Sequence, residues 1–148
     1  MQKNFLREVL TFTSQAGFKN YLETNGTLFS ELKDVIDLVD IVAMDFKLSS
    51  STGMGDLWWM HRRFLEVASR KEVFIKTVIC DSTSEEDFLK GLQLLEEVNP
   101  GLSLVLQPNS RQASPRLNLK LEEFKKISQG RGIRAHIIPQ LHKEWGVK

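Results

Sequence analysis

The feature that most constrains the fold is an alternation of short apolar runs with amphipathic segments along the whole chain. The apolar runs recur mostly about thirty residues apart, which is the size of one strand–helix–strand unit. Such an alternation favours an α/β fold with a parallel sheet. We therefore expect helices packed on one side of a curved sheet whose five strands lie near residues 19–24, 40–47, 72–79, 102–107 and 133–138.

The helical segments carry their own signals. The first has an apolar stripe at helical spacing, widened by Leu6 and Leu10, and its main members are Phe5, Val9, Phe12 and Ala16. Residues 28–38 predict a second helix, and residues 49–58 predict a loop. Thr83 and Glu86 form a predicted capping box at the start of a later helix.

Composition narrows the classes of function. The chain has 148 residues and 41% hydrophobic content, which suits one domain with one core. Its formal charge of +1 gives no strong field for nucleic acid or for an anionic membrane, so a small-molecule ligand is the better expectation. The single cysteine, Cys80, excludes within this chain a disulfide framework and a metal site held by several thiolates. These features and the lack of a membrane-spanning apolar run predict a cytoplasmic protein.

Polar residues gather where the predicted strands end. In parallel α/β folds ligands bind beyond the carboxyl ends of the strands, so these residues are candidates for a binding site. They are Glu23, Thr24 and Asn25 after the first strand, Asp45 and Lys47 after the second, Lys76 and Thr77 late in the third, and Gln107 and Pro108 after the fourth.

Each of these signals also has a structural interpretation. Glu23 can cap the next helix, and Asn25–Gly26 is a common turn pair. Asp45 and Lys47 project to the same side of a strand and can form an ordinary ion pair. His61 on a helix and Cys80 beside a strand fit structural roles better than catalytic ones. The coincidence of polar groups at one edge is what favours a binding site.

The motifs ETNGTL, AMDFK and LQP together resemble the radical S-adenosylmethionine (SAM) superfamily. The ending PQLHKEWGVK resembles the 7-carboxy-7-deazaguanine synthase branch of that superfamily. The activating enzymes of pyruvate formate-lyase and of anaerobic ribonucleotide reductase are the nearest alternatives, because they share a D/E-T-N-G strand end and a D-x-K strand. The resemblance implies a partial (β/α)6 TIM-like barrel.

Two motifs of the resembled family are not in this sequence, namely the CxxxCxxC loop and the GGEP segment. Three cluster thiolates cannot come from one cysteine, so we expect the chain to be a C-terminal portion that alone has no cluster-dependent activity. Five strands also do not close a barrel, which would leave the strand around Asn20–Thr24 as an unpaired edge.

The resemblance further implies a chemistry and residue roles. In the family, a [4Fe–4S] cluster and SAM generate a 5′-deoxyadenosyl radical that converts 6-carboxy-5,6,7,8-tetrahydropterin to 7-carboxy-7-deazaguanine, in queuosine and deazapurine biosynthesis. The implied SAM contacts here are Glu23, Thr24 and Asn25, Asp45 and Lys47, Lys76 and Thr77, and Gln107 and Pro108, with Gln140 and His142 facing the pterin substrate.

Metal and partner assignments follow the same resemblance. The Mg²⁺ of the branch is implied to lie near the cluster loop, so no metal ligand is assigned in this chain, and no catalytic residue is either. The implied partner is the small pterin, not nucleic acid or a membrane, and the resemblance leaves room for a homodimer. Two other functions stay open: a fragment of a glycyl-radical-activating enzyme, and a non-catalytic α/β ligand-binding domain.

Overall fold

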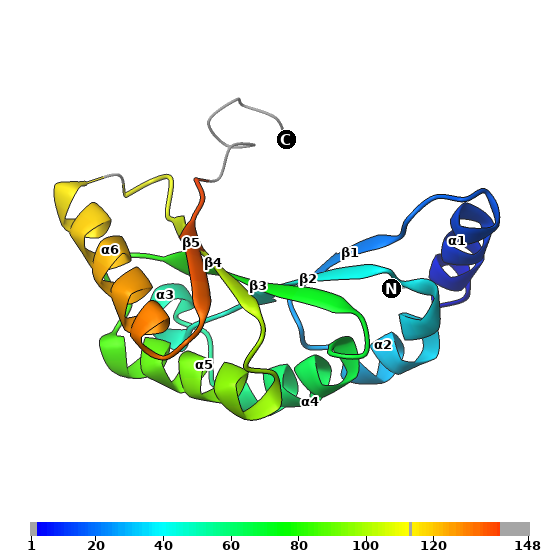
Figure 1. The fold of residues 1–148 in the computed structure, drawn as a ribbon, viewed down its shortest axis with the longest axis horizontal. Coiled ribbons are helices and arrows are strands. Elements are labelled where there is room, and N and C mark those ends of the chain that lie inside the picture. Colours follow the sequence, from blue (N-terminus) through cyan, green and yellow to red (C-terminus); the bar gives the residue numbers. More distant parts are fainter. Residues whose placement is uncertain (1–2, 113, 140–148) are drawn as a thin grey trace.

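Five parallel strands form one curved sheet in the computed structural model, which describes residues 3–112 and 114–139 (Figure 1). Neighbouring strands in the sheet are consecutive in the chain, in the order β1-β2-β3-β4-β5. Their bounds are β1 (Tyr21–Thr24), β2 (Ile41–Phe46), β3 (Glu72–Ile79), β4 (Ser103–Pro108) and β5 (Arg134–Ile137). The predicted α/β fold of five parallel strands alternating with helices is confirmed.

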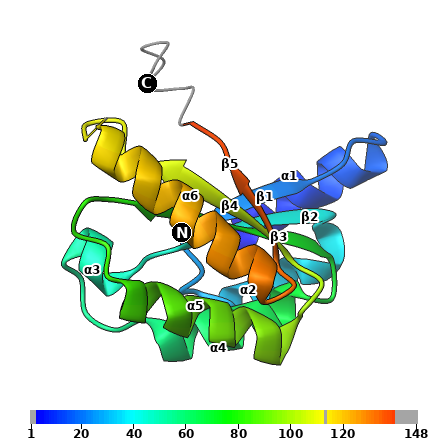
Figure 2. The same ribbon diagram turned by 60° about the vertical axis from the view of Figure 1, so that its left-hand side comes forward.

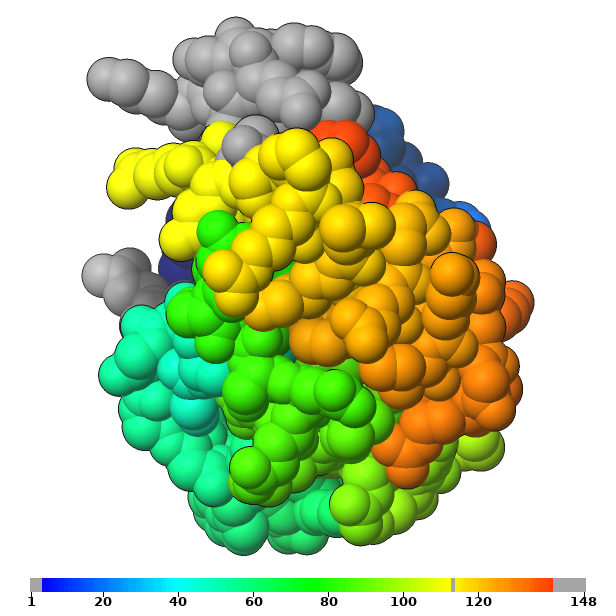
Figure 3. Space-filling view, turned by 90° about the vertical axis from the view of Figure 1, so that its left-hand side faces the viewer, coloured from blue at the N-terminus to red at the C-terminus, as the bar shows by residue number. Residues whose placement is uncertain are grey.

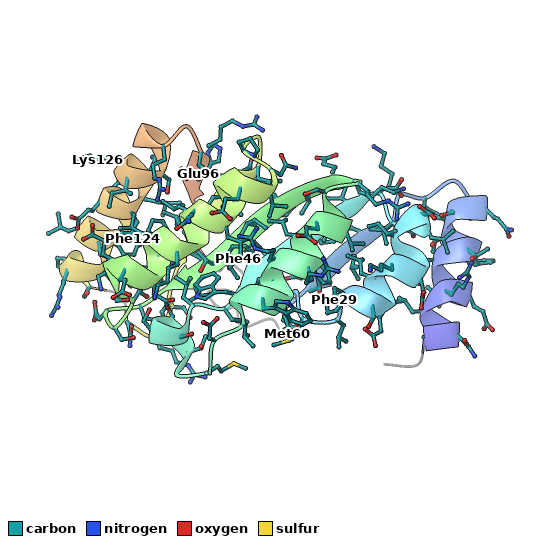
Figure 4. The ribbon with its side chains drawn as sticks, turned by 90° about the horizontal axis from the view of Figure 1, so that it is seen from below. Phe29, Phe46, Met60, Glu96, Phe124 and Lys126 are labelled. Atoms are coloured by element: carbon teal, nitrogen blue, oxygen red, sulfur yellow. The ribbon has the colours of Figure 1, made fainter. Side chains whose placement is uncertain are left out.

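The helices that connect the strands lie together on one face of the sheet. Their bounds are α1 (Lys3–Gln15), α2 (Phe29–Val35), the 3-10 turn η1 (Ile36–Leu38), α3 (Ser49–Thr52), α4 (Trp58–Ala68), α5 (Glu85–Val98) and α6 (Pro115–Gly130). Figure 4, which views the molecule from the helix side, shows α4, α5 and α6 side by side in front of the sheet, and α1 packs against α2 and η1 at the β1 end (see also Figure 2). The opposite face of the sheet carries no helix of the described chain (Figure 1).

The core fills the space between the sheet and this helical layer. In β3 the alternation of buried and less buried residues follows the period of two, so one face of the strand is apolar. Viewed from the β5 end, α6 and α5 cover much of the visible surface, and part of the β5 region is seen beside α6 (Figure 3). The largest fully buried side chains include Met44, Phe64, Leu65, Ile75, Leu92, Leu104, Leu106, Leu117 and Leu121.

Three local predictions are corrected. In the stripe predicted for α1, Leu10 is buried, but Phe5 and Phe12 are 64% and 71% exposed, because no described element covers that side of the helix. The segment expected to be only a loop contains the short helix α3, whose Ser50 donates from its N–H and its Oγ to Asp87 of α5 at 2.9 and 2.8 Å. The third correction concerns the cap of α5.

The cap of α5 is Ser84 rather than Thr83. The Ser84 side chain accepts a hydrogen bond from the Asp87 N–H at 3.2 Å. Thr83 is buried and accepts from the Cys80 N–H at 2.8 Å, so its hydroxyl closes the preceding turn. The sequence contains two adjacent hydroxyl residues, and only the turn geometry decides which one begins the helix.

None of the helices among residues 3–112 and 114–139 has the length and apolarity needed to cross a bilayer.

Candidate functional site

The strand alternation divides the predicted site residues between the two faces of the sheet. Residues two apart on a strand share a face. Glu23, Asp45, Lys76 and Gln107 lie on the open face, where no helix of the part that the structure describes packs. Thr24, Thr77 and Pro108 occupy the alternate positions, on the same face as the buried core residues. The sequence prediction placed residues that are adjacent in the chain in one site, whereas the strands direct them to opposite faces of the sheet.

Four charged side chains meet on the open face near the carboxyl ends of β1, β2 and β3. Lys47 donates to Asp45 at 2.5 Å, and Lys76 of β3 forms an ion pair with Glu23 of β1. These four residues, Glu23, Asp45, Lys47 and Lys76, are called the charge quartet below. Their formal charges sum to zero.

The sheet register explains how the quartet assembles. Asp45 stands opposite Lys76, and Glu23 stands opposite Ala43, so the Glu23–Lys76 pair crosses β2 beside Ala43. The Ala43 methyl group leaves space for that crossing, and Ala43 is fully buried. A larger residue at position 43 would obstruct the pair.

Asp45 has an unused acceptor. Its Oδ2 accepts from Lys47, but its Oδ1 is buried and has no hydrogen-bond partner among the described residues. A buried carboxylate oxygen without a donor costs free energy. The quartet presents two ammonium and two carboxylate groups, which are the kinds of partner that a zwitterionic ligand requires.

The turn after β1 is closed by hydrogen bonds of its own side chains. The Gly26 N–H donates to Thr24 Oγ1 at 3.2 Å, and Thr27 Oγ1 donates to Asn25 Oδ1 at 2.8 Å. The predicted site residues Thr24 and Asn25 thus use their side chains within the turn. Gly26 has a φ of 68° and lies against Met44 of β2, which fixes the turn at the end of the neighbouring strand.

The remaining predicted residues are distributed as follows. Thr77 is 2% exposed and its Oγ1 donates to the Phe46 carbonyl at 3.1 Å, so it joins β3 to β2 inside the core. Gln107 is half-buried on the open face, opposite Val78. The predicted substrate residues Gln140 and His142 lie outside the described residues.

His61 and Cys80, which the sequence favours as structural residues, are both buried. The Cys80 Sγ accepts from Asn109 Nδ2 at 3.3 Å. Burial lowers the pKa of His61 from 6.5 to about 4, against the opposing effects of the Asn25 carbonyl and the Asp45 and Asp56 carboxylates. His61 is therefore neutral at physiological pH.

A resident iron–sulfur cluster does not fit these side chains. A cluster that leaves one iron for SAM needs three thiolates, and the chain has one cysteine, which is buried. Among the described residues no group of three or more His, Cys, Asp and Glu side chains could hold a metal ion. The donor set does suit SAM, because the quartet offers ammonium groups for its carboxylate and carboxylate groups for its amine.

Comparison with known proteins supplies the relationship. No family model matches the chain. The 7-carboxy-7-deazaguanine synthase of Geobacter sulfurreducens is 37% identical over 129 residues, covering 85% of this chain and 51% of that protein. The chain is related to the 7-carboxy-7-deazaguanine synthases. The synthase of Methanopyrus kandleri is 32% identical over 142 residues, covering 93% of this chain and 52% of that protein.

The resemblance to the deazaguanine synthases predicted from the sequence motifs is thus confirmed. The chain spans about half the length of the curated synthases it matches. A solved domain of a pyruvate-formate lyase-activating enzyme from Bacteroides vulgatus has the same fold, with a TM-score of 0.74 over 92% of this chain and 91% of that one. Because only 14% of residues are identical, this likeness concerns the fold alone.

Proposed function

We propose that the chain forms part of a radical SAM enzyme of the 7-carboxy-7-deazaguanine synthase type, and that its open face binds the amino acid portion of SAM. The observation that carries the proposal is the charge quartet with the unused Asp45 oxygen. The relationship to the synthases supports the reaction class, which is the conversion of 6-carboxy-5,6,7,8-tetrahydropterin to 7-carboxy-7-deazaguanine.

The quartet can accommodate a zwitterion by exchanging partners. The ligand carboxylate would take the place of Asp45 at the Lys47 ammonium, and the ligand amine would donate to Asp45 or Glu23. Surface ion pairs are individually weak, about 0–1 kcal/mol, so opening the Lys47–Asp45 pair costs little. Each new charge-assisted hydrogen bond contributes about 1.5–3 kcal/mol once the bound ligand itself shields the site from water. When the ligand amine donates to Asp45, the exchange leaves both Lys47 and Asp45 paired and favours the bound state.

The other residues of the open face orient the rest of the ligand. Lys76 is only 15% exposed and lies beside Asp45, where it would hold Glu23 in position. Gln107 of β4 is further along the same rim and can bond to the adenine or ribose. When bound with a reduced cluster held outside this chain's residues, SAM supplies the radical that begins the reaction. The residues of this chain bind SAM, orient it and exclude water.

The sequence comparisons favour this function over a glycyl-radical-activating enzyme. The synthases share 37% and 32% identity with the chain, whereas the likeness to the activating-enzyme domain rests on 14% identity. A non-catalytic ligand-binding role would differ in the chimera described below, because such a domain would bind a ligand without forming the deazaguanine product.

The test is a chimera. The half of the Geobacter synthase that this chain matches would be replaced by this chain, and the fusion assayed anaerobically with SAM and the carboxytetrahydropterin. We expect formation of the deazaguanine product and binding of SAM in calorimetry. Lys47→Ala should weaken SAM binding by about tenfold to a hundredfold, and Lys126→Ala, which changes an exposed lysine of α6, should leave it unchanged.

Circular dichroism would establish the folded fraction of each fusion protein. A folded chimera that binds SAM but forms no product would contradict the assigned reaction. A change of less than about twofold for Lys47→Ala would mean that Lys47 only neutralises Asp45.

A further inference from the structure

His61 is fully buried on α4 behind the proposed site. Its ring stacks on Phe46 with centroids 4.9 Å apart and an interplanar angle of 5°, and the edge of Trp58 meets it at 5.9 Å. Phe46, labelled in Figure 4, thus connects β2 to α4 through this contact. Two aromatic neighbours therefore fix the plane of the imidazole.

Neither ring nitrogen of His61 has a hydrogen-bond partner among the described residues. A buried polar group without a partner destabilises a fold, and an apolar ring would fill the same space at no such cost. Polar groups that break this rule in natural proteins concentrate at functional sites. We therefore infer that the imidazole has a role other than filling space in the core.

The neighbourhood of His61 supplies the acceptor. Phe46 and Met44 share the helix face of β2, and the turn of residues 24–27 lies against Met44. The main-chain carbonyl of Asn25 is close enough to the ring to raise its pKa, although no hydrogen bond is completed. The Asn25 side chain is engaged by Thr27, which leaves the Asn25 main-chain oxygen as the acceptor that we assign to His61.

We propose that His61 is a positioning residue: its imidazole donates a hydrogen bond to the Asn25 carbonyl when a ligand engages Glu23, and so holds the turn after β1 in the binding geometry. Glu23 is two residues before Asn25, and the turn between them closes through Thr24 Oγ1. Fixing the carbonyl therefore limits the movement of the backbone that carries Glu23. The inference rests on the proposed SAM site.

Three substitutions separate positioning from packing. His61→Phe keeps the stacked ring and removes both nitrogens, whereas His61→Gln and His61→Asn each keep an amide N–H donor. His61→Phe should leave the urea midpoint unchanged or raise it, because it removes unpaired polar atoms from the core. It should weaken SAM binding to the chimera by about tenfold, and at least one amide variant should retain the wild-type affinity.

Leu65→Ala on the same helix is the matched control. Leu65 is fully buried, so its truncation should lower the urea midpoint while leaving SAM affinity per folded molecule unchanged. Loss of affinity in His61→Phe with an unchanged or higher midpoint supports positioning. Equal SAM affinity in wild type and His61→Phe overturns the inference and leaves the proposed function standing, whereas a folded wild-type chimera that binds no SAM overturns both.

Discussion

Asp45 and His61 show at the level of single residues what the sequence could and could not reveal. The ends of the apolar runs identified Glu23, Asp45, Lys47 and Lys76, because polar residues are conspicuous after buried strands. The unpaired state of Asp45 Oδ1 and of the His61 nitrogens depends on contacts between elements distant in the chain. No local pattern encodes those contacts.

The sequence also could not reveal which face of the sheet Thr77 would occupy. Adjacent residues on a strand point to opposite faces, so Lys76 and Thr77 cannot both face one ligand from the open side. The alternation within β3 carried this information, but the sequence alone did not show which face would be covered by helices.

The burial of His61 predicts a pH dependence of stability. In the unfolded chain the imidazole takes up a proton near pH 6.5, whereas its pKa in the folded protein is about 4. Between these values the unfolded state binds more protons, so the stability that is present above pH 6.5 is lost as the pH falls toward 4. The shift corresponds to about 3 kcal/mol.

Urea unfolding of wild type and His61→Phe at pH 7 and pH 4.5 would measure this. The free energy of unfolding should fall by about 2–3 kcal/mol more in the wild type than in the variant. The carboxylates of Asp45 and Asp56 and the ammonium of Lys47, which act on the ring, are present in both proteins. Parallel losses in the two proteins would show that His61 does not resist protonation.

Gly26 allows a second prediction at the residue scale. Its φ of 68° is unfavourable for any side chain, and an added Cβ would collide with the Met44 side chain. Gly53 has the same φ of 68° with no atom within 4 Å of such a Cβ, so it isolates the backbone effect. We expect Gly53→Ala to cost about 1–2 kcal/mol and Gly26→Ala to cost about 1–3 kcal/mol more. Equal losses in thermal unfolding would mean that the turn does not lie against Met44.

At the scale of elements, the strands were predicted to within two residues of their observed bounds. Residues 72–79 were predicted and observed alike, because an apolar alternation flanked by polar residues specifies a strand locally. The second helix was predicted as one continuous segment, whereas its range divides into α2 and the 3-10 turn η1. The short helix α3 was missed because it depends on Asp87, a residue far along the chain.

Lys120 of α6 holds the turn between β3 and α5. Its ammonium donates to the carbonyls of Asp81 at 2.5 Å, Thr83 at 2.9 Å and Cys80 at 3.4 Å, which uses all three of its hydrogens. Lys120→Met should therefore lower the free energy of unfolding by about 2–3 kcal/mol. Lys126→Met, an exposed change on the same helix, should stay within about 0.5 kcal/mol. Similar urea midpoints for the two variants would contradict a structural role for Lys120.

The outer face of α1 predicts a different behaviour. Phe12 is 71% exposed, so Phe12→Lys should change the free energy of unfolding by less than about 0.5 kcal/mol and should reduce binding of an apolar fluorescent dye. Leu10 is 8% exposed on the packed side, and Leu10→Ala should cost about 2–5 kcal/mol. A Phe12 variant as unstable as the Leu10 variant would show that this face of α1 is covered in solution.

For the whole molecule, the chain provides a helical layer, a sheet and an open face that carries the charge quartet. The periodicity of the sequence predicted the first two because they follow from local patterns summed along the chain. The residues that would bind an iron–sulfur cluster are not among those that the periodicity predicts. The chain spans about half the length of its curated relatives, and its one cysteine is engaged in the core.

That cysteine allows a prediction about the whole chain. A SAM-binding [4Fe–4S] cluster needs three thiolates, whereas Cys80 is 4% exposed and its Sγ accepts a hydrogen bond from Asn109. Anaerobic reconstitution of the isolated chain with iron and sulfide should therefore give no stable cluster signal in absorption or electron paramagnetic resonance, and wild type and Cys80→Ser should retain the same trace of iron. In the chimera with the Geobacter half, the cluster should form equally well with or without Cys80→Ser, since Cys80 supports the fold and is not a ligand. A stoichiometric cluster in the isolated chain that disappears in Cys80→Ser would contradict this assignment and would place an iron ligand inside the core that the structure shows as sealed.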